Sequence, residues 1–395
     1  MLNRKSDIQR LMAKCLTAAV LLLAASGCVR KPDLYLHHGE HIDIDIPVID
    51  LGLEVYWDYE FSYGITYDWT AEWVYGWDAF DYQVFGEIGY TQPKVFDLRR
   101  YHTNWTRYAP HTSVKASTIH STHFNGEYDW GFWDILVWND IETSDGVQSI
   151  NIDEETTLDS VFAYTNQTMH ASRYQAPQHT RSFYEPEPLF SAYHQGLEIN
   201  QQLDGFVFDP ERNVWVKKLN MTLEPVTFIY LTQVILHNNK GRITGVDGAA
   251  NLSGMARSVN VNNGITGRDP VTVFYNVRFK PNCNKDGESV DVAGGRLMTF
   301  GMCGMNPNRI TRSGEEWDIN DKSKHYMDLN MQFNNGMDST FVFDVTQQVR
   351  KLYKGGVITI ELDMDTIPTP VRPGGSAFSA VVLDYEDGGS FEIEM

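Results

Sequence analysis

The amino-acid sequence predicts a mainly β protein with two β-sandwich domains and one or two short helices. Apolar and polar residues alternate in several short stretches, as in Ile42, Ile44 and Ile46 with Asp43 and Asp45 between them, and this period of two is typical of β-strands. Glycine, asparagine and aspartate separate these stretches, which favours tight turns and a sandwich. The length of 395 residues gives room for two domains.

The first residues have the layout of a signal peptide. Four basic residues precede an apolar run from Leu16 to Ala25, which is about ten residues long and therefore too short to cross a bilayer core that needs about twenty. The run ends in Ala25, Ser26 and Gly27 directly before Cys28. We predict that residues 1–27 are a lipoprotein signal peptide and that Cys28 is lipidated. The alternative is an ordinary secretory signal that happens to be followed by a cysteine.

Acylation of Cys28 with two or more chains would hold the mature protein on a membrane, because each buried methylene contributes about 0.8 kcal/mol. We therefore expect an outer-membrane lipoprotein, anchored by lipid at the cell surface. Residues 28–40 are predicted to be a polar tether. A cluster of prolines between Ala176 and Pro188 marks the expected division between an N-terminal domain, residues 41–180, and a C-terminal domain, residues 186–395.

The first predicted strand begins at His41, and Pro47 makes it an edge strand or ends its regular part. The later predicted strands are Ser149–Asp153, Val226–His237, Val271–Phe279, Thr340–Asp344, Val357–Asp363, Ala377–Asp384 and Phe391–Met395. One helix is predicted over Thr346–Lys354, where Val345, Val349 and Leu352 share a stripe and two glycines follow. A second short helical turn is expected at Glu187–Tyr193.

Aromatic residues are concentrated in the first half of the chain, which holds eight of the ten tryptophans. Most aromatic residues in strands pack in sandwich cores. An exposed aromatic platform that stacks on sugars or grips a protein is the other interpretation. Trp69, Trp73 and Trp77 are the candidate ligand platform, because a spacing of four places them on one face of a helix.

Two cysteines, Cys283 and Cys303, remain in the expected folded part. In an oxidising compartment they could form a disulfide, which would add roughly 3 kcal/mol on the chain-entropy model. Two buried thiols are the alternative, because spacing alone does not fix the geometry.

The chain is acidic, with a formal net charge of −20, and removal of residues 1–27 changes this to −23. A negative field of this size repels phosphate backbones, so we expect no nucleic-acid partner. The sequence contains no nucleophile-elbow, zinc-protease or phosphate-loop motif. We therefore predict a protein that is not an enzyme, with no catalytic residues, no cofactor and no metal site.

Four segments together form a recognisable pattern: Cys28 with its short basic link, the strand-like Trp133–Asn139, the link Glu187–Phe190, and Leu223–Leu236 followed by Asn251–Ala256 as a long strand and loop. In these segments the chain resembles fimbrillin-like surface lipoproteins of Bacteroidetes, a group that includes fimbrial anchor and accessory subunits. The likeness spans most of residues 28–395. The aromatic insert Trp57–Phe85 has no counterpart in that pattern.

The resemblance implies two transthyretin-like β-sandwich domains of Greek-key type, and assembly with other fimbrial subunits by donor-strand exchange. The candidate exchange elements are His41–Leu51 and Ser390–Met395, although each can instead complete its own sheet. We predict a fimbrial anchor, accessory or adhesin-like subunit that works by strand pairing and protein contact. The alternative is a surface glycan-binding lipoprotein that uses exposed tryptophans.

Overall fold

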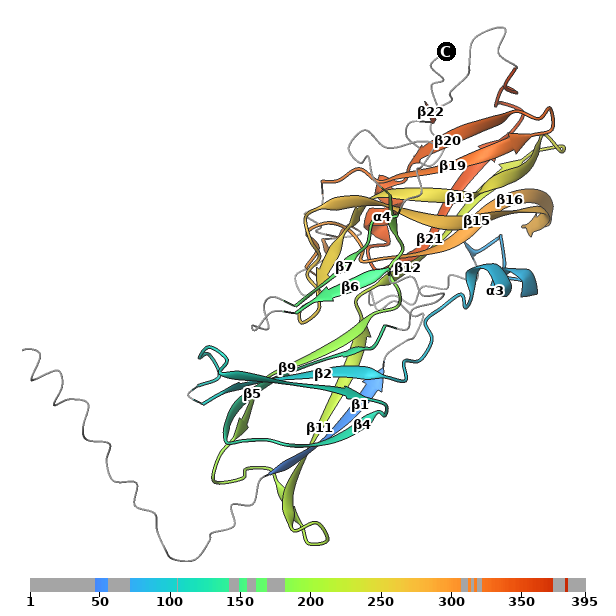
Figure 1. Ribbon diagram of the computed structural model, residues 1–395. Coiled ribbons are helices and arrows are strands. Elements are labelled where there is room, and N and C mark those ends of the chain that lie inside the picture. The colour runs from blue at the N-terminus through green and yellow to red at the C-terminus, as the bar shows by residue number, and fades with distance from the viewer. Residues whose placement is uncertain are drawn as a thin grey trace, which may run out of the picture. The chain divides into compact units, whose positions relative to one another are not determined.

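The computed structural model describes residues 47–55, 72–104, 106–141, 149–154, 161–168, 182–306, 312–313, 316–317, 322–371 and 381–382. In these ranges the chain is mainly β, with two short helices, α3 (Ala79–Phe85) and α4 (Thr346–Lys351) (Figure 1). The strands form two large curled sheets, which confirms the predicted fold of two β-sandwiches. Neither of these helices has the length and apolar character that a membrane span requires.

The first large sheet curls around an apolar cluster that also includes residues of β12 and β16 of the second sheet. Its strands, in spatial order, are β3 (Ser113–Ile119), β2 (Phe96–Thr103), β5 (Gly131–Asn139), β9 (Phe190–Ile199), β11 (Val214–Pro225), β1 (Val48–Val55) and β4 (His123–Glu127), with β10 (Val207–Asp209) paired to β11. The alternation in β1 explains the core, because Ile49, Leu51 and Leu53 are buried while Glu54 is exposed. Strands β1 and β11 run parallel, and β4 flanks β1 on its other side.

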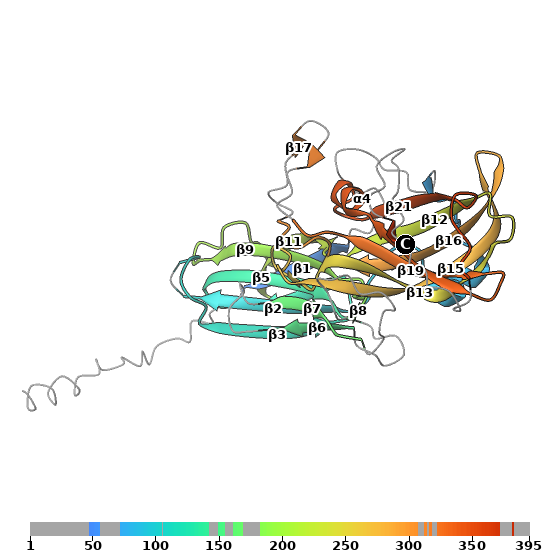
Figure 2. The same ribbon diagram turned by 90° about the horizontal axis from the view of Figure 1, so that it is seen from above.

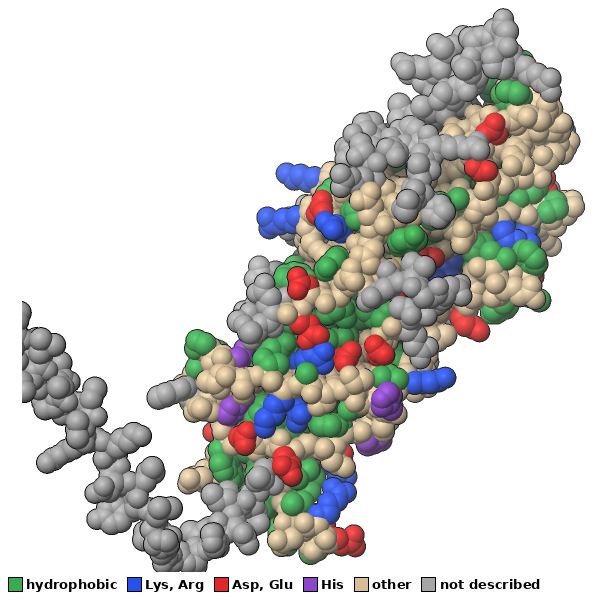
Figure 3. Space-filling view, viewed as in Figure 1, with side chains coloured by type: hydrophobic (Ala, Val, Ile, Leu, Met, Phe, Trp, Pro, Cys, Tyr) green, Lys and Arg blue, Asp and Glu red, His purple; other side chains and the backbone are tan. Residues whose placement is uncertain are grey.

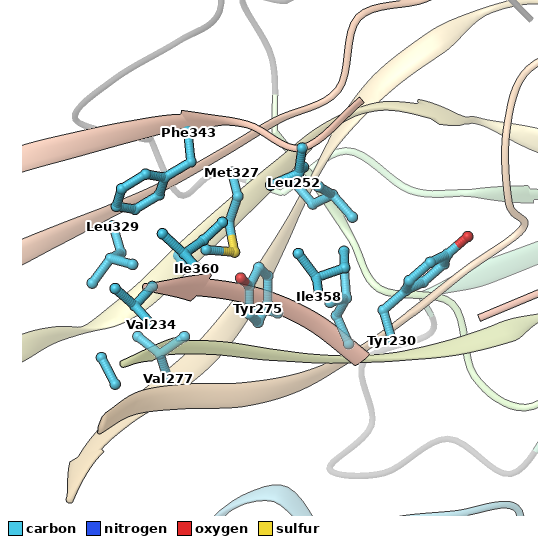
Figure 4. Close-up of a cluster of buried hydrophobic side chains, with 14 of the residues drawn as sticks. Tyr230, Val234, Leu252, Tyr275, Val277, Met327, Leu329, Phe343, Ile358 and Ile360 are labelled. Carbon is cyan, nitrogen blue, oxygen red and sulfur yellow. The ribbon is translucent and has the colours of Figure 1, made fainter. Parts of the chain in front are cut away.

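The second large sheet bends at one long strand. Its order is β21 (Gly356–Asp363), β12 (Phe228–His237), β16 (Glu288–Thr299), β15 (Pro270–Lys285), β13 (Ile243–Ala256), β19 (Tyr326–Phe333), β20 (Asp338–Asp344) and β22 (Val381–Val382), with β8 (Ser182–Tyr184) paired to β15. The first part of β15 pairs with β13 and its second part with β16. The two halves therefore face each other across a core to which Val234, Tyr275 and Phe343 contribute (Figure 4).

Two small sheets complete the described strands. One consists of β14 (Ser258–Asn260), β7 (Phe162–Thr165) and β6 (Ile150–Asp153), and the other of β17 (Arg312–Ser313) and β18 (Glu316–Trp317). Leu136 and Trp138 on β5 pack with Ile150 and Ala163 of the three-stranded sheet. This second cluster covers the face of β5 that does not point into the first core.

The predicted helix and most of the predicted strands are confirmed. Helix α4 begins at Thr346 as expected, with the Asp344 carboxylate accepting a hydrogen bond from its backbone amide, and it ends at Lys351 rather than Lys354. It lies next to β21 (Figure 2), where the Gln348 side chain exchanges two hydrogen bonds with the Thr359 backbone. Strands β6, β12, β15, β20 and β21 occupy five of the predicted ranges.

Other element predictions need correction. The helical turn expected at Glu187–Tyr193 is wrong, because β9 begins at Phe190 and pairs along β5. The long strand Leu223–Leu236 is two strands, β11 and β12, divided at Val226 and Thr227. The expected loop Asn251–Ala256 belongs to β13.

The first and last predicted strands are only partly described. The structure describes β1 from Val48, so residues 41–46 of the first strand lie outside the described ranges. Within Ala377–Asp384 it describes β22, and Phe391–Met395 lies outside. The domain limits of 41–180 and 186–395 remain a prediction. Apart from β8, which pairs with β15, the strands of the two large sheets change from the first sheet to the second between β11 and β12.

Candidate interaction surfaces

The segment from Glu72 to Tyr90, called the strap below, packs on the outer face of the second sheet. The buried Gln233 on β12 holds its beginning: the Gln233 Oε1 atom accepts hydrogen bonds from the backbone amides of Val74 and Tyr75, at 2.8 and 3.2 Å. The Gln233 Nε2 atom donates to the Glu72 carbonyl and to Thr359. One side chain therefore ties an irregular segment to two strands.

Apolar side chains reinforce this attachment. Trp73 and Tyr75 are buried in one cluster with Ile229 and Leu231 of β12 and Val292 of β16. Gly294 is required directly beneath the strap, because a Cβ atom there would lie 2.7 Å from the Tyr75 ring. The outer face of the second sheet is thus an apolar surface that the strap covers.

A charged network fixes the end of the strap at α3. The buried Asp81 carboxylate pairs with Arg278 and Lys280 of β15 and accepts a hydrogen bond of 2.8 Å from the Tyr75 hydroxyl. Asp78 caps the helix, and the Asp81 carboxylate accepts from the Asp78 amide in return. The two carboxylates face two cations, so the network is close to neutral.

The predicted tryptophan platform is corrected by this arrangement. Trp73 is buried at 7% exposure, and Trp77 is half-buried against Trp73 and Phe85. Trp69 lies outside the described residues. A buried indole cannot stack on a sugar ring, so packing is the interpretation that holds for Trp73.

The possible disulfide between Cys283 and Cys303 is not formed in this structure. Cys283 on β15 and Cys303 are both present as thiols, and each packs in a different cluster. The Cys283 Sγ atom lies 3.8 Å from the Lys280 carbonyl, and the Cys303 Sγ atom lies 3.6 Å from the Gly254 carbonyl. The alternative of two thiols is what the structure contains. Cys28 lies outside the described residues, and its lipidation remains a prediction.

Part of the first candidate exchange element is visible as β1. Residues Val48–Leu51 of that element pair with β11 on one side and β4 on the other, so in this structure they complete their own sheet. The second candidate, Ser390–Met395, lies outside the described residues.

An open cleft lies where β9 and β11 separate. Their ladder consists of two residue pairs, Ser191 with Glu224 and Phe190 with Pro225. Beyond these pairs the strands diverge around a cleft of about 420 Å³, lined by Ala192 and His194 on one side and Asn220 and Thr222 on the other. Burial lowers the pKa of His194, and nearby Lys217 lowers it further, whereas the Asp134 carboxylate opposes the shift.

The cleft exposes strand edges. On its β9 side, β11 has no ladder partner between Lys217 and Leu223 among the strands that the structure describes, because β10 pairs only as far as Val216. An edge with unpaired backbone groups is a template for another strand. In the part of the chain with assigned positions, no group of three or more His, Cys, Asp or Glu side chains could hold a metal ion.

Neither a protein-family model nor a curated protein matches the sequence. Solved structures of similar fold include a candidate adhesin of Bacteroides ovatus, with 15% identity, a TM-score of 0.46, and coverage of 82% of this chain and 95% of that one. A candidate adhesin of Bacteroides thetaiotaomicron has 10% identity, a TM-score of 0.44, and coverage of 81% and 93%. The fimbrial anchor protein Mfa2 of Porphyromonas gingivalis has 13% identity, a TM-score of 0.39, and coverage of 80% and 90%.

These neighbours are adhesin-like and fimbrial proteins of Bacteroidetes.

Sequence reasoning missed the residues that hold the strap and those that line the cleft. The start of α3 could have been predicted from Asp78 and Asp81, because an acidic residue three positions after an aspartate is typical of a helix start. The partners Arg278 and Lys280 lie almost two hundred residues later. No local pattern links such distant positions. The face shown in Figure 3 mixes acidic, basic and apolar side chains, so charge alone marks no site there.

Proposed function

We propose that this protein is an outer-membrane lipoprotein that acts as a fimbrial anchor, accessory or adhesin-like subunit. It works by strand pairing and protein contact rather than by catalysis. Residues 1–27 are removed, Cys28 carries the lipid, and the β-sandwiches are displayed at the cell surface.

The cleft between β9 and β11 is the observation that carries this proposal. Both strands end their mutual ladder after two residue pairs, and Asn220, Met221 and Thr222 of β11 line the opening. A partner strand can satisfy such an edge by backbone hydrogen bonds, which is the physical basis of β-augmentation. The cleft thus offers a place for strand pairing even though β1 fills its own position in the sheet.

The layout before Cys28 supports the anchor. An apolar run of about ten residues followed by Ala25, Ser26 and Gly27 favours cleavage at a cysteine over retention of a membrane span. Mass spectrometry of the mature protein should find an acylated N-terminal Cys28. Cys28→Ala should move the protein from the membrane fraction to the soluble fraction.

Site-specific photo-crosslinking in cells tests the role of the cleft. A benzoylphenylalanine at Thr222, inside the cleft, should give adducts with a second envelope protein. Peptide mapping should show that the adduct joins Thr222 to a terminal strand of a polymer-forming subunit. The matched control is the same probe at Val371, an exposed position outside the cleft, which should give no such adduct.

Two results would contradict the role of the cleft. One is the absence of adducts from Thr222 in cells that display polymers; the other is a crosslinked partner joined through a loop rather than a strand. The glycan-binding alternative has no specific observation in its favour, because Trp73 is buried and Trp77 is half-buried.

A further inference from the structure

Three valines form a row across the start of β1. Val48 is opposite Val216 in the parallel pair of β1 and β11, and Val216 is opposite Val207 in the hairpin of β10 and β11. Residues directly opposite in neighbouring strands have their side chains on the same face of a sheet. Val207 is 72% exposed, which makes it one of the most exposed large apolar side chains of the described residues.

The other face of the same hairpin is aromatic. Phe208 is 39% exposed and lies opposite Trp215, with ring centroids 5.4 Å apart. Lys217 and Lys218 follow on β11, and the Lys217 ammonium group lies 5.4 Å from the centroid of the Phe206 ring. Aromatic rings, aliphatic side chains and lysines close together are typical of protein surfaces at a membrane interface.

The hairpin extends past the point where the tether joins the fold. Because Val48 is in register with Val216, the residues of β11 before Val216 and the turn that joins β10 to β11 continue beyond the start of β1. Figure 1 shows the yellow-green end of β11 continuing past the blue start of β1. The turn itself is polar and contains an ion pair between Asp209 and Arg212.

Chain connectivity brings a bilayer to this end of the protein. Cys28 lies nineteen residues before Pro47, the residue that precedes β1. A chain of this length reaches at most about 65 Å when fully extended. An acylated Cys28 would therefore keep the start of β1 at a high effective concentration near the lipid surface.

We infer that the β10–β11 hairpin, together with Val48, is a foot that rests on the lipid bilayer. This inference rests on the lipid anchor proposed above and adds the orientation of the anchored protein. The hairpin lies along the membrane surface on the face that carries Val207, Val216 and Val48, so the Val207 side chain enters the headgroup boundary while the polar turn remains at headgroup level. A row of valines is too small to anchor the protein by itself, so the foot orients a protein that its acyl chains already hold.

Depth measurements on the full lipidated protein test the foot. Val207→Cys is labelled with an environment-sensitive fluorophore, and the protein is reconstituted into vesicles of phosphatidylethanolamine and phosphatidylglycerol. The matched control is Val371→Cys, where the native valine is 66% exposed. Parent protein treated in parallel gives the background from Cys283 and Cys303. Brominated lipids should quench the label at position 207 at least about twofold more strongly than the label at position 371.

Aqueous iodide should show the opposite order, with the label at position 207 protected. If the protein floats with the vesicles and both labels respond equally to brominated lipid and to iodide, the foot is refuted and the hairpin is open to a protein partner instead. If the protein does not float and mass spectrometry finds no acyl chain on Cys28, the lipid anchor itself is refuted, and the foot with it.

Discussion

The buried Asp81 carboxylate organises its surroundings through charge. Burial, together with the hydrogen bond to Asp81, raises the pKa of Tyr75 far above its ordinary value, so the phenol remains a donor at any physiological pH. Asp78 has the opposite shift: hydrogen bonds from the Asp81 amide and from Lys280 lower its pKa to about 2. Two aspartates three residues apart therefore have different tasks, one as a buried partner of cations and one as a helix cap.

The low pKa of Asp78 makes the stability of the strap depend on pH. A carboxyl whose pKa is lowered by folding stabilises the folded state fully above its unfolded pKa of about 4, and this contribution is lost as the pH falls towards 2. We expect the free energy of unfolding to fall between pH 4 and pH 2, and to fall less in Asp78→Asn. Urea titrations at several pH values measure this. The matched control is Asp204→Asn at an exposed loop position, in which the free energy of unfolding should change with pH as it does in the wild type. The same pH dependence in all three proteins would contradict the role assigned to Asp78.

The two thiols give a second prediction at this scale. Burial raises the pKa of the Cys283 thiol, which lowers its thiolate content, and Cys303 is buried at 6% exposure. We expect an aromatic disulfide reagent to react slowly with the folded mature protein and to titrate two thiols per chain once it is unfolded without reductant. A chain that releases thiols only after reduction would show that the disulfide forms.

Where one face of an element is buried, its residue pattern is enough to predict the element. Where the pattern is weak, the element depends on pairing with distant strands. The stripe in α4 was sufficient to predict that helix. The alternation that predicted the first strand lies mostly before the described residues, whereas β1 runs to Val55 with Ile49, Leu51 and Leu53 on its buried face. In β9 the alternation is weak, and the strand exists because β5 pairs along it and because the Asn139 side chain accepts a hydrogen bond from the Phe190 amide. The position of β13 was hidden by Gly254, which the sequence suggested was part of a loop and which occupies a register shift in a ladder.

The candidate sites were less predictable than the elements. Trp73 and Trp77 were correctly singled out as unusual, but whether an aromatic residue covers a sheet or faces solvent depends on Gln233, Arg278 and Lys280, which are distant in the sequence. The disulfide was equally undetermined, because spacing does not report the direction of a Cβ atom. Predicting the cleft would have required knowing that β9 and β11 stop pairing after two residue pairs.

The turn from α4 into β21 provides a prediction at the element scale. Gly355 has a φ angle of +96°, and a Cβ atom there would lie 2.2 Å from the Ile229 carbonyl oxygen. Gly355→Ala should therefore lower the free energy of unfolding by at least about 2 kcal/mol, from backbone strain plus a clash with the backbone of β12. Urea unfolding measures the loss.

Gly336→Ala is the matched control. Its φ angle is +77°, and nothing lies within 4 Å of the added Cβ atom. We expect a loss of only about 1 kcal/mol from the left-handed conformation. Equal losses in the two variants would mean that the contact with Ile229 is not decisive.

At the scale of the whole molecule, the strap connects two sheets that the sequence order would keep apart. In the chain it lies between β1 and β2 of the first sheet, and in space it packs on β12 and β16 of the second. Trp73 and Tyr75 share one apolar cluster with residues of both sheets. Unfolding of either sheet therefore exposes part of the surface that the other has buried.

This coupling can be tested at Asp81. Asp81→Asn leaves Arg278 and Lys280 without their buried anion, and we expect a loss of about 3 kcal/mol in the free energy of unfolding. Hydrogen exchange should quicken first in residues 72–86. Asp78→Asn at neutral pH is the control and should cost less than about 1 kcal/mol, because that carboxylate is half exposed. If hydrogen exchange in the strap is unchanged in Asp81→Asn, the charged network does not hold the strap on the sheet.

The parallel pairing of β1 with β11 has a mechanical consequence. The tether enters at the first residue of β1, whereas β11 leaves towards the second sheet at its last residue, Pro225. Tension between a bilayer and the distal sheet would pull the two strands along their axes in opposite directions. All eight residue pairs from Val48 to Val55 would then bear the load simultaneously, in shear, whereas an antiparallel hairpin would open one rung after another. A cell-surface protein joined in this way resists detachment by flow without any additional crosslink.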